Sequence, residues 1–364
     1  MYGWNPSPYP QRSPNLLVDC SHCRTPLVLP PGATSIRCAV CHQVTQIAPH
    51  QRPPPGPAPS QVPSQNLQQY SPSPPNPHGS KKAVIIGISY RRSRYELKGC
   101  LNDAKCMKYL LLNKFQFPES SILLLTEDQP DPLRLPTKHN IKMAMYWLVK
   151  DCKAGDSLVF HYSGHGSQQR NRDGSEVDGF DETILPLDFE TQGMIVDDDI
   201  NLSLVRPLTH GVRLHAIVDA CHSGTVLDLP FLCRMHSNGQ YVWEDHRPRN
   251  GAWKGTNGGE AYCFSGCDDS QTSADTSALS QVTYTGAMTY CFIQAIERGH
   301  AGTYRDLLYN MRHGIRNSDV GRPSGPVSTL IEMLLTGGSY NPNHVQEPQL
   351  TASYMFDIGT RFYI

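Results

Sequence analysis

The chain has 364 residues, of which 38% are hydrophobic and 18% charged, and its formal net charge is −1. That length suits one folded domain of about 250 to 300 residues with a smaller appendage. The balanced charge argues against a protein that binds nucleic acid or an anionic membrane. The sequence contains neither an apolar run of about 18 residues nor a signal-peptide core, so we expect no membrane span and a location in the cytoplasm, with the nucleus as a second compartment.

Cysteine usage separates two parts of the chain. After a polar tail at residues 1–15, two CxxC pairs follow each other, Cys20 with Cys23 and Cys38 with Cys41. Four thiolates at this spacing can coordinate one Zn²⁺ tetrahedrally. The alternative is four free thiols, but a double CxxC spacing is specific to metal sites and favours zinc. The other cysteines are scattered, which suits a reducing compartment better than a disulfide framework. We therefore predict a structural zinc finger over residues 16–48.

Residues 49–80 are rich in proline, glutamine and serine and almost free of aliphatic side chains. Such a segment cannot bury enough apolar surface to fold, so we expect an extended linker. The compact domain then occupies residues 81–364.

Apolar periodicity in this domain predicts an α/β fold. Strands are expected at 83–89, 121–125, 157–164, 214–218, 261–266 and 353–358, and helices at 99–115, 140–152, 285–298 and 304–316. Because strands alternate with helices, we predict a mainly parallel sheet with helices on both faces.

Two of the predicted strands end in chemically reactive side chains. The strand SLVFHYS runs into Ser163-Gly164-His165-Gly166, and the strand at 214–218 runs into Asp219-Ala220-Cys221-His222-Ser223-Gly224. The carboxyl ends of parallel strands open into one crevice, so His165 and Cys221 are expected to face each other. An imidazole can remove the thiol proton and leave a strong nucleophile. Either residue alone is more often structural, but together they predict acyl transfer by a Cys/His dyad.

Asp219 lies two residues before Cys221, so on a strand both side chains point the same way. A carboxylate beside the nucleophile would raise the pKa of the thiol unless the acid has another partner. We expect that partner to be a basic side chain of the substrate.

An acidic stretch lies between the two reactive segments. Residues 173–199 contain no lysine or arginine but the acids Asp173, Glu176, Asp178, Asp181, Glu182, Asp188, Glu190, Asp197, Asp198 and Asp199. The stretch does not fit the EF-hand template. It is therefore either a solvated acidic face or a site where carboxylates share a divalent cation.

Residues 228–260 show little periodicity and are expected to form a long loop. They include Arg234, Arg247, Arg249 and Lys254. Long structureless loops inside compact domains are usually functional or mobile. For an enzyme that cuts after basic residues this would be a self-processing loop; otherwise it is a solvated surface loop.

Two motifs carry a family resemblance. Tyr-Ser-Gly-His-Gly at 162–166 and Asp-Ala-Cys-His-Ser-Gly at 219–224, with His165 56 residues before Cys221, resemble the plant type I metacaspases. This resemblance covers residues 81–364 and implies a caspase-like α/β/α sandwich and a thiol protease made as a zymogen. Residues 20–41 resemble an LSD1-type zinc finger through Cys-Arg-x-x-Leu, Gly-Ala and the closing CxxC. That implies protein contacts, including LSD1-type regulators, through residues 16–48, and Arg24 and Arg37 are too few to favour nucleic acid.

The metacaspase resemblance also implies roles for individual residues. His165 would act as the base and Cys221 as the nucleophile, with backbone amides at Gly166 and Cys221 stabilising the oxyanion. A pocket for arginine or lysine would be lined by Asp103, which belongs to the Gly-Cys-x-Asn-Asp motif at 99–103, by Ser163 and by Asp219. An activating Ca²⁺ would be held by Asp181, Asp198, Asp199 and Asp228.

The function expected from the sequence is calcium-stimulated cleavage of proteins after Arg or Lys, in programmed cell death or stress proteolysis. One alternative is a zinc-finger adaptor whose caspase-like domain mainly binds proteins, but the intact dyad argues against it. Another is a protease of the same clan that prefers Asp or Asn. Asp103 and Asp219 argue against an acidic preference, because like charges repel.

Overall fold

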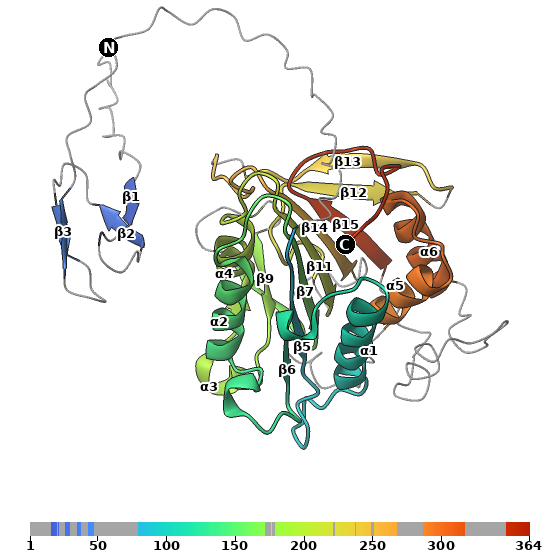
Figure 1. The fold of residues 1–364 in the computed structure, drawn as a ribbon, viewed down its shortest axis with the longest axis horizontal. Helices are drawn as coiled ribbons and strands as arrows, with labels where there is room; N and C mark the ends of the chain where they lie inside the picture. Colours follow the sequence, from blue (N-terminus) through green and yellow to red (C-terminus); the bar gives the residue numbers. More distant parts are fainter. Residues whose placement is uncertain are drawn as a thin grey trace, which may run out of the picture. The chain divides into compact units, whose positions relative to one another are not determined.

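The computed structural model describes residues 16–19, 21, 26–29, 35–37, 43–46, 79–171, 176, 179–220, 223–236, 238–248, 251–267, 287–316 and 347–364 (Figure 1). The chain divides into two compact units, residues 1–67 and 68–364. The predicted tail and residues 49–78 of the predicted linker lie outside the described residues.

The first unit contains two short antiparallel hairpins. β1 (Leu16–Asp19) pairs with β2 (Pro26–Leu29), and β3 (Ser35–Arg37) pairs with β4 (Val44–Gln46). The Ser21 N–H donates to Thr45 Oγ1 at 3.0 Å and links the first hairpin to the second. β1 ends immediately before Cys20 and β3 immediately before Cys38, so both CxxC pairs follow a first strand. The four cysteines themselves lie outside the described residues.

The second unit is built on an eight-stranded sheet. In spatial order its strands are β13 (Tyr241–Asp245), β12 (Phe231–Met235), β15 (Glu347–Ala352), β14 (Glu260–Cys267), β11 (Arg213–Asp219), β7 (Ser157–Ser163), β5 (Lys81–Gly87) and β6 (Ile122–Thr126). The strands from β14 to β6 are mutually parallel, and β15, β12 and β13 extend the sheet antiparallel. The predicted mainly parallel sheet is confirmed, with a mixed edge.

Helices cover both faces of this sheet, as predicted (Figure 1). α1 (Cys100–Asn113), α5 (Ala287–Glu297) and α6 (Tyr304–Arg316) pack on one face with Ala83 and Ile85. α2 (Lys138–Val149) packs on the other with Val84 and Ile86. Alternate residues of β5 therefore enter opposite cores, which explains its uninterrupted apolar run. Full burial of each valine or isoleucine side chain stabilises the fold by roughly 1.5–3 kcal/mol.

A smaller antiparallel sheet follows β7. It consists of β8 (Gly166–Arg170), β9 (Phe180–Ile184) and β10 (Ile195–Val196), with the one-turn helices α3 (Phe189–Gln192) and α4 (Asp197–Ile200) and the π-helical segment η3 (Asn201–Val205). Two 3-10 turns, η1 (Glu119–Ser121) and η2 (Pro132–Arg134), flank β6. The acidic stretch thus contains ordered strands. None of the helices that the structure describes is long and apolar enough to span a membrane.

Two sequence-based expectations are wrong. Residues 353–358 do not form the last strand; β15 ends at Ala352. Phe356 and Ile358 are buried in the core, but the ladders that β15 forms with its two neighbours end at Ala352. Residues 228–260 are not structureless either, because β12 and β13 form a hairpin at the sheet edge. Its signal was Asn238-Gly239 between two apolar runs, with Gly239 at φ 79° as hairpin turns require.

Candidate active site and acidic cluster

His165 occupies the connection between β7 and β8, where its backbone is fixed on both sides. Its N–H donates to Tyr90 Oη at 3.1 Å. Its carbonyl oxygen accepts from Tyr162 Oη at 2.7 Å and from the Leu185 N–H at 3.1 Å. The residue is buried, so the orientation of its ring is set by the fold rather than by solvent.

The His165 ring has one nitrogen available for proton transfer. Nε2 lies 2.9 Å from the Tyr95 carbonyl oxygen, which can only accept a hydrogen bond, so Nε2 carries the proton. Burial lowers the pKa of the imidazole, which keeps the ring neutral near pH 7. The Tyr90 ring packs against it with centroids 4.8 Å apart. The lone pair of a neutral ring in this tautomer lies on Nδ1, the atom that can accept a thiol proton.

The strand register relates His165 to the predicted nucleophile. β7 and β11 are parallel neighbours, and Ser163 lies directly opposite Asp219. His165 follows Ser163 by two residues, and Cys221 follows Asp219 by two. Cys221 itself lies outside the described residues.

Asp103, Ser163 and Asp219 come together at the carboxyl ends of β7 and β11. The Ser163 hydroxyl donates to Asp103 Oδ2 at 2.8 Å. Asp219 Oδ2 accepts from the Thr289 N–H in the first turn of α5 at 2.7 Å, where the helix dipole favours a negative charge. The three side chains are buried, with at most 3% exposure. The structure therefore groups the residues predicted to form the basic-residue pocket.

Asp103 reaches Ser163 because α1 lies unusually close to β5. A Cβ added to Gly87 would lie 2.5 Å from the Cys100 carbonyl oxygen and 2.8 Å from Ala104 Cβ. Glycine is therefore required at the end of β5 for this approach.

The buried carboxyls of Asp103 and Asp219 lie close together, and keeping both ionised without a cation between them is electrostatically unfavourable. Burial, and secondly the negative charge of Asp219, raise the pKa of Asp103 well above its usual range. A guanidinium or ammonium group placed between the two carboxyls would offset this repulsion and return both acids to the ionised form.

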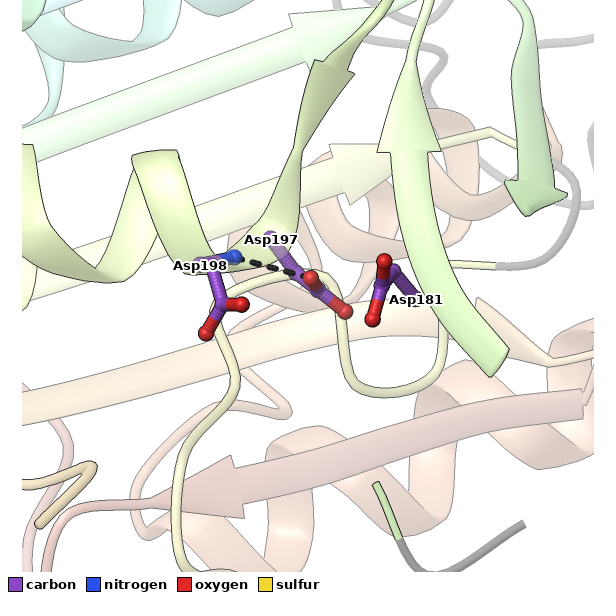
Figure 2. A group of neighbouring side chains, drawn as sticks. All are labelled: Asp181, Asp197 and Asp198. Atoms are coloured by element: carbon purple, nitrogen blue, oxygen red, sulfur yellow. Dashed lines mark hydrogen bonds between the residues drawn. The ribbon is translucent and has the colours of Figure 1, made fainter. Parts of the chain in front are cut away.

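A second group of acids lies around the small sheet. Carboxylate oxygens of Asp181, Asp197 and Asp198 lie within 4.8 Å of one another (Figure 2). Asp197 accepts from the Glu182 N–H and the Asp198 N–H, both at 2.8 Å. Burial raises the pKa of Asp197 to about 9, with the charges of Asp228 and Glu182 adding to the effect.

Two of the predicted calcium ligands, Asp181 and Asp198, lie in this group, and Asp199 lies outside it. Asp199 is not part of the group, because its carboxylate pairs with Lys142 of α2 at 2.7 Å. Asp197 lies in the group instead: α4 begins at Asp197, and successive side chains of a helix turn by about 100°, so three consecutive acids cannot share one face. The run of three aspartates was visible in the sequence, but which two face Asp181 depends on where the helix begins.

Asp228, the fourth predicted ligand, is joined to the group through a lysine. Lys254 Nζ contacts Asp228 and lies 2.6 Å from Asp198 Oδ1. Burial raises the pKa of Asp228 to about 6 and that of Glu176, a further neighbour, to about 7. Sequence reasoning placed Glu176 in the acidic stretch and Lys254 in the expected self-processing loop, but it did not predict that Lys254 contacts these acids.

The donor set fits a calcium ion. Carboxylate oxygens are the ligands that Ca²⁺ prefers, and several converging acids are more compatible with a hard divalent cation than with a soft metal. Burial is the main cause of the raised pKa values of Asp197 and Glu176, and the charges of neighbouring acids, Asp228 among them, add to it; a divalent cation would offset that second contribution.

The described cysteines contrast with the predicted nucleophile. Cys106, Cys152, Cys233, Cys263 and Cys291 are free thiols. Burial raises the pKa values of Cys106, Cys233 and Cys263 to about 12, so these thiols stay protonated at neutral pH. They are packing groups rather than nucleophiles.

Comparison with known proteins identifies the family. Residues 81–230 match the model described as "Metacaspase, peptidase C14 domain", and residues 20–44 match the LSD1 zinc finger. Metacaspase-1 of Arabidopsis thaliana is 65% identical, with 97% of each chain covered. Metacaspase-2 of the same organism is 52% identical over 94% of this chain and 98% of the relative, and Metacaspase-1 of Eremothecium gossypii is 36% identical over 79% and 67%. The chain therefore belongs to the metacaspases, which are caspase-like cysteine endopeptidases, and carries an LSD1 zinc finger ahead of its peptidase domain.

Proposed function

We propose that this peptidase cleaves on the carboxyl side of arginine or lysine, with Cys221 as the nucleophile and His165 as the general base. The observation that carries the proposal is the pair of buried carboxyls: Asp219 ends β11, two residues before Cys221, and Asp103, in the first turn of α1, accepts from Ser163 at the end of β7. Ser163 joins them as a hydroxyl that donates to Asp103. A cationic substrate side chain would supply the positive charge that this pocket needs.

The reaction would follow the chemistry of a thiol and an imidazole. Nδ1 of His165 takes the proton of the Cys221 thiol, and the sulfur attacks the scissile carbonyl. Backbone amides at Gly166 and Cys221 stabilise the oxyanion. The imidazolium protonates the leaving amine as the carbon–nitrogen bond breaks, and water, deprotonated by His165, then hydrolyses the thioester.

A substrate panel tests the specificity. On matched peptides ending in Arg, Lys, Asp or Asn before a reporter group, we expect turnover after Arg and Lys only, with a preference of about 100-fold or more. Preference for Asp or Asn would refute the basic pocket. An absence of turnover on every peptide would favour the adaptor alternative.

We also propose that Ca²⁺ activates the enzyme by binding Asp181, Asp197, Asp198 and Asp228. Asp228 follows Cys221 by seven residues, so an ion bound to its carboxylate would order the segment beside the nucleophile. The buried pocket acids imply that the described state must open to admit a side chain, and the ion would shift the population toward an open state.

Calcium removal is therefore expected to suppress activity. Chelation should lower turnover by about tenfold or more, millimolar Ca²⁺ should restore it, and Mg²⁺ should substitute poorly because it keeps its water shell. Asp197→Ala is expected to abolish the response to added Ca²⁺, whereas Asp188→Ala, an acid outside the group, should keep it. Full turnover in chelator would show that this acidic group does not activate the enzyme through Ca²⁺.

Self-processing is expected after Arg249. Of the four basic residues in the predicted loop, Arg234 lies in β12 between two paired strands, and Lys254 is buried. Arg247 precedes Pro248, whose tertiary amide is a poor scissile bond. Arg249 remains, although it lies outside the described residues. N-terminal sequencing of the fragments should find Asn250, and Arg249→Gln should block the cut while Arg247→Gln does not.

We further propose that the enzyme is made as a zymogen and acts in the cytoplasm and nucleus, in programmed cell death or stress proteolysis. The family supports this role, and residues 16–48 would recruit LSD1-type regulators through a Zn²⁺ held by Cys20, Cys23, Cys38 and Cys41. Capture of such a regulator by residues 1–48, lost in Cys38→Ser, would support the finger's role. Equal capture by both forms would contradict it.

A further inference from the structure

One buried lysine lies inside the acidic group. The Lys254 side chain is only 8% exposed, and its Nζ contacts Asp228, Asp198 Oδ1 at 2.6 Å and Glu176 Oε1 at 3.2 Å. Within the part of the chain that the structure describes, it is the only lysine or arginine that forms ion pairs with these three acids. A single ammonium therefore bridges three separate segments.

Two of its partners, Asp198 and Asp228, belong to the proposed calcium site. Asp198 also lies in the group with Asp181 and Asp197. An oxygen that accepts a hydrogen bond from an ammonium at this distance cannot also coordinate a metal with the same lone pair. The two cations would also repel each other strongly at such a short separation.

We propose that Lys254 is a built-in counter-cation of the acidic group and that a divalent ion must displace its ammonium in order to bind. This inference rests on the proposed calcium activation. In the absence of metal, Lys254 offsets part of the repulsion among the acids. When the metal binds, the same acids exchange one tethered positive charge for a divalent ion.

Hydrogen bonds hold the backbone of Lys254 in place, so only its side chain is free to move in this exchange. Asn201 Nδ2 donates to the carbonyl oxygens of Lys254 at 2.8 Å, Leu227 at 3.0 Å and Asp228 at 3.2 Å. Asn201 is buried, so it holds the Lys254 backbone beside the segment that carries Asp228. The ammonium, by contrast, is at the end of a flexible four-carbon chain. The exchange is therefore a rotation of the lysine side chain, and the tether returns the ammonium when the metal leaves.

Such a competitor sets the calcium affinity of the site. Metal can bind only to the fraction of molecules in which the ammonium has left, so the apparent affinity is the intrinsic affinity multiplied by that fraction. Lys254 would thereby keep the enzyme inactive at low calcium without any change in the ligands.

Calorimetric titration with CaCl₂ tests the competition. The protein carries Cys221→Ala to prevent self-processing. Lys254→Met, which removes the charge but keeps the length, is expected to lower the Kd for Ca²⁺ by about tenfold or more. Lys254→Arg keeps the charge and should bind as weakly as the parent. Lys142→Met is the matched control, because Lys142 pairs with Asp199 outside the group; its Kd should change by less than about threefold.

Chemical labelling of the unsubstituted lysine gives a second readout that does not depend on a variant. With an amine-acetylating reagent and mass spectrometry, Lys254 should be protected in chelator and become reactive in saturating Ca²⁺. Lys105, whose side chain is 51% exposed and pairs with Asp128 away from the group, should react equally in both.

The outcomes separate the two proposals. Two outcomes would overturn the displacement but not the calcium site. One is calcium binding in the parent with an unchanged or higher Kd in Lys254→Met. The other is continued protection of Lys254 in saturating Ca²⁺. No binding heat in any of the proteins would overturn the calcium site, and the displacement with it.

Discussion

Replacing Cys221 with alanine is expected to abolish peptide hydrolysis. Removing the nucleophile of a covalent hydrolase costs about 10⁴-fold or more in kcat, since only oxyanion stabilisation and substrate binding remain. The measurement is turnover of an Arg peptide by purified parent and variant proteins at matched concentration and saturating Ca²⁺. Substrate should still bind to the variant, because the alanine leaves Asp103 and Asp219 in place.

Cys152→Ala is the matched control. Cys152 is a free, half-buried thiol whose pKa is raised by burial, and its loss should change turnover by less than about twofold. Equal loss in both variants would indicate a general effect of cysteine removal on folding. Activity that persists in Cys221→Ala would show that another group is the nucleophile.

The second large effect is expected at the pocket. Asp219→Asn removes the charge but keeps an oxygen that can accept the Thr289 N–H bond, so the fold should survive. Loss of one partner of a buried charge pair costs roughly 2–5 kcal/mol, which corresponds to about 30- to 4,000-fold in kcat/KM on Arg peptides. Because the substitution removes a charge that is buried beside Asp103, the variant should unfold at the same temperature as the parent or higher.

A neutral substrate isolates the charge effect. On a peptide with citrulline in place of arginine, the kcat/KM of Asp219→Asn should be less than about threefold below that of the parent, since no ion pair is lost. Asp128→Asn, which breaks only the surface pair with Lys105, should match the parent on both peptides. An unchanged kcat/KM for Arg in Asp219→Asn would show that this carboxylate does not bind the substrate cation.

Whether a strand or helix could be predicted from the sequence depends on how much of its surface is buried. The strands from 81 to 87 and 213 to 219 are buried on both faces, so continuous apolar runs predicted them correctly. The helix at 304–316 was predicted to the residue because one side is apolar and the other polar. The hairpin at 231–245 was missed because each of its strands has only five residues and the outer one, β13, is only partly buried, so its apolar pattern is weak.

The acidic group of Asp181, Asp197 and Asp198 shows the limit of reasoning from spacing. A dense run of acids indicated a cation site, and three of the four predicted ligands do lie in or beside the group. The choice of Asp197 over Asp199, however, depended on the first residue of a one-turn helix. Helix boundaries are the least reliable part of any sequence-based prediction.

The sequence by itself determined the strand-end motifs that contain His165 and Cys221, the double CxxC finger and the alternation of strands and helices. Each of these features depends only on residues that are close in the sequence: on their types, their spacing and the period of their apolar side chains. Only the tertiary structure decided that Asp103 of α1 contacts Ser163 of β7, that the Tyr95 carbonyl fixes the His165 tautomer, and that Lys254 enters the acidic group. These contacts join residues 56 to 70 positions apart, and their energies arise from burial and charge in a folded interior, which no local pattern contains.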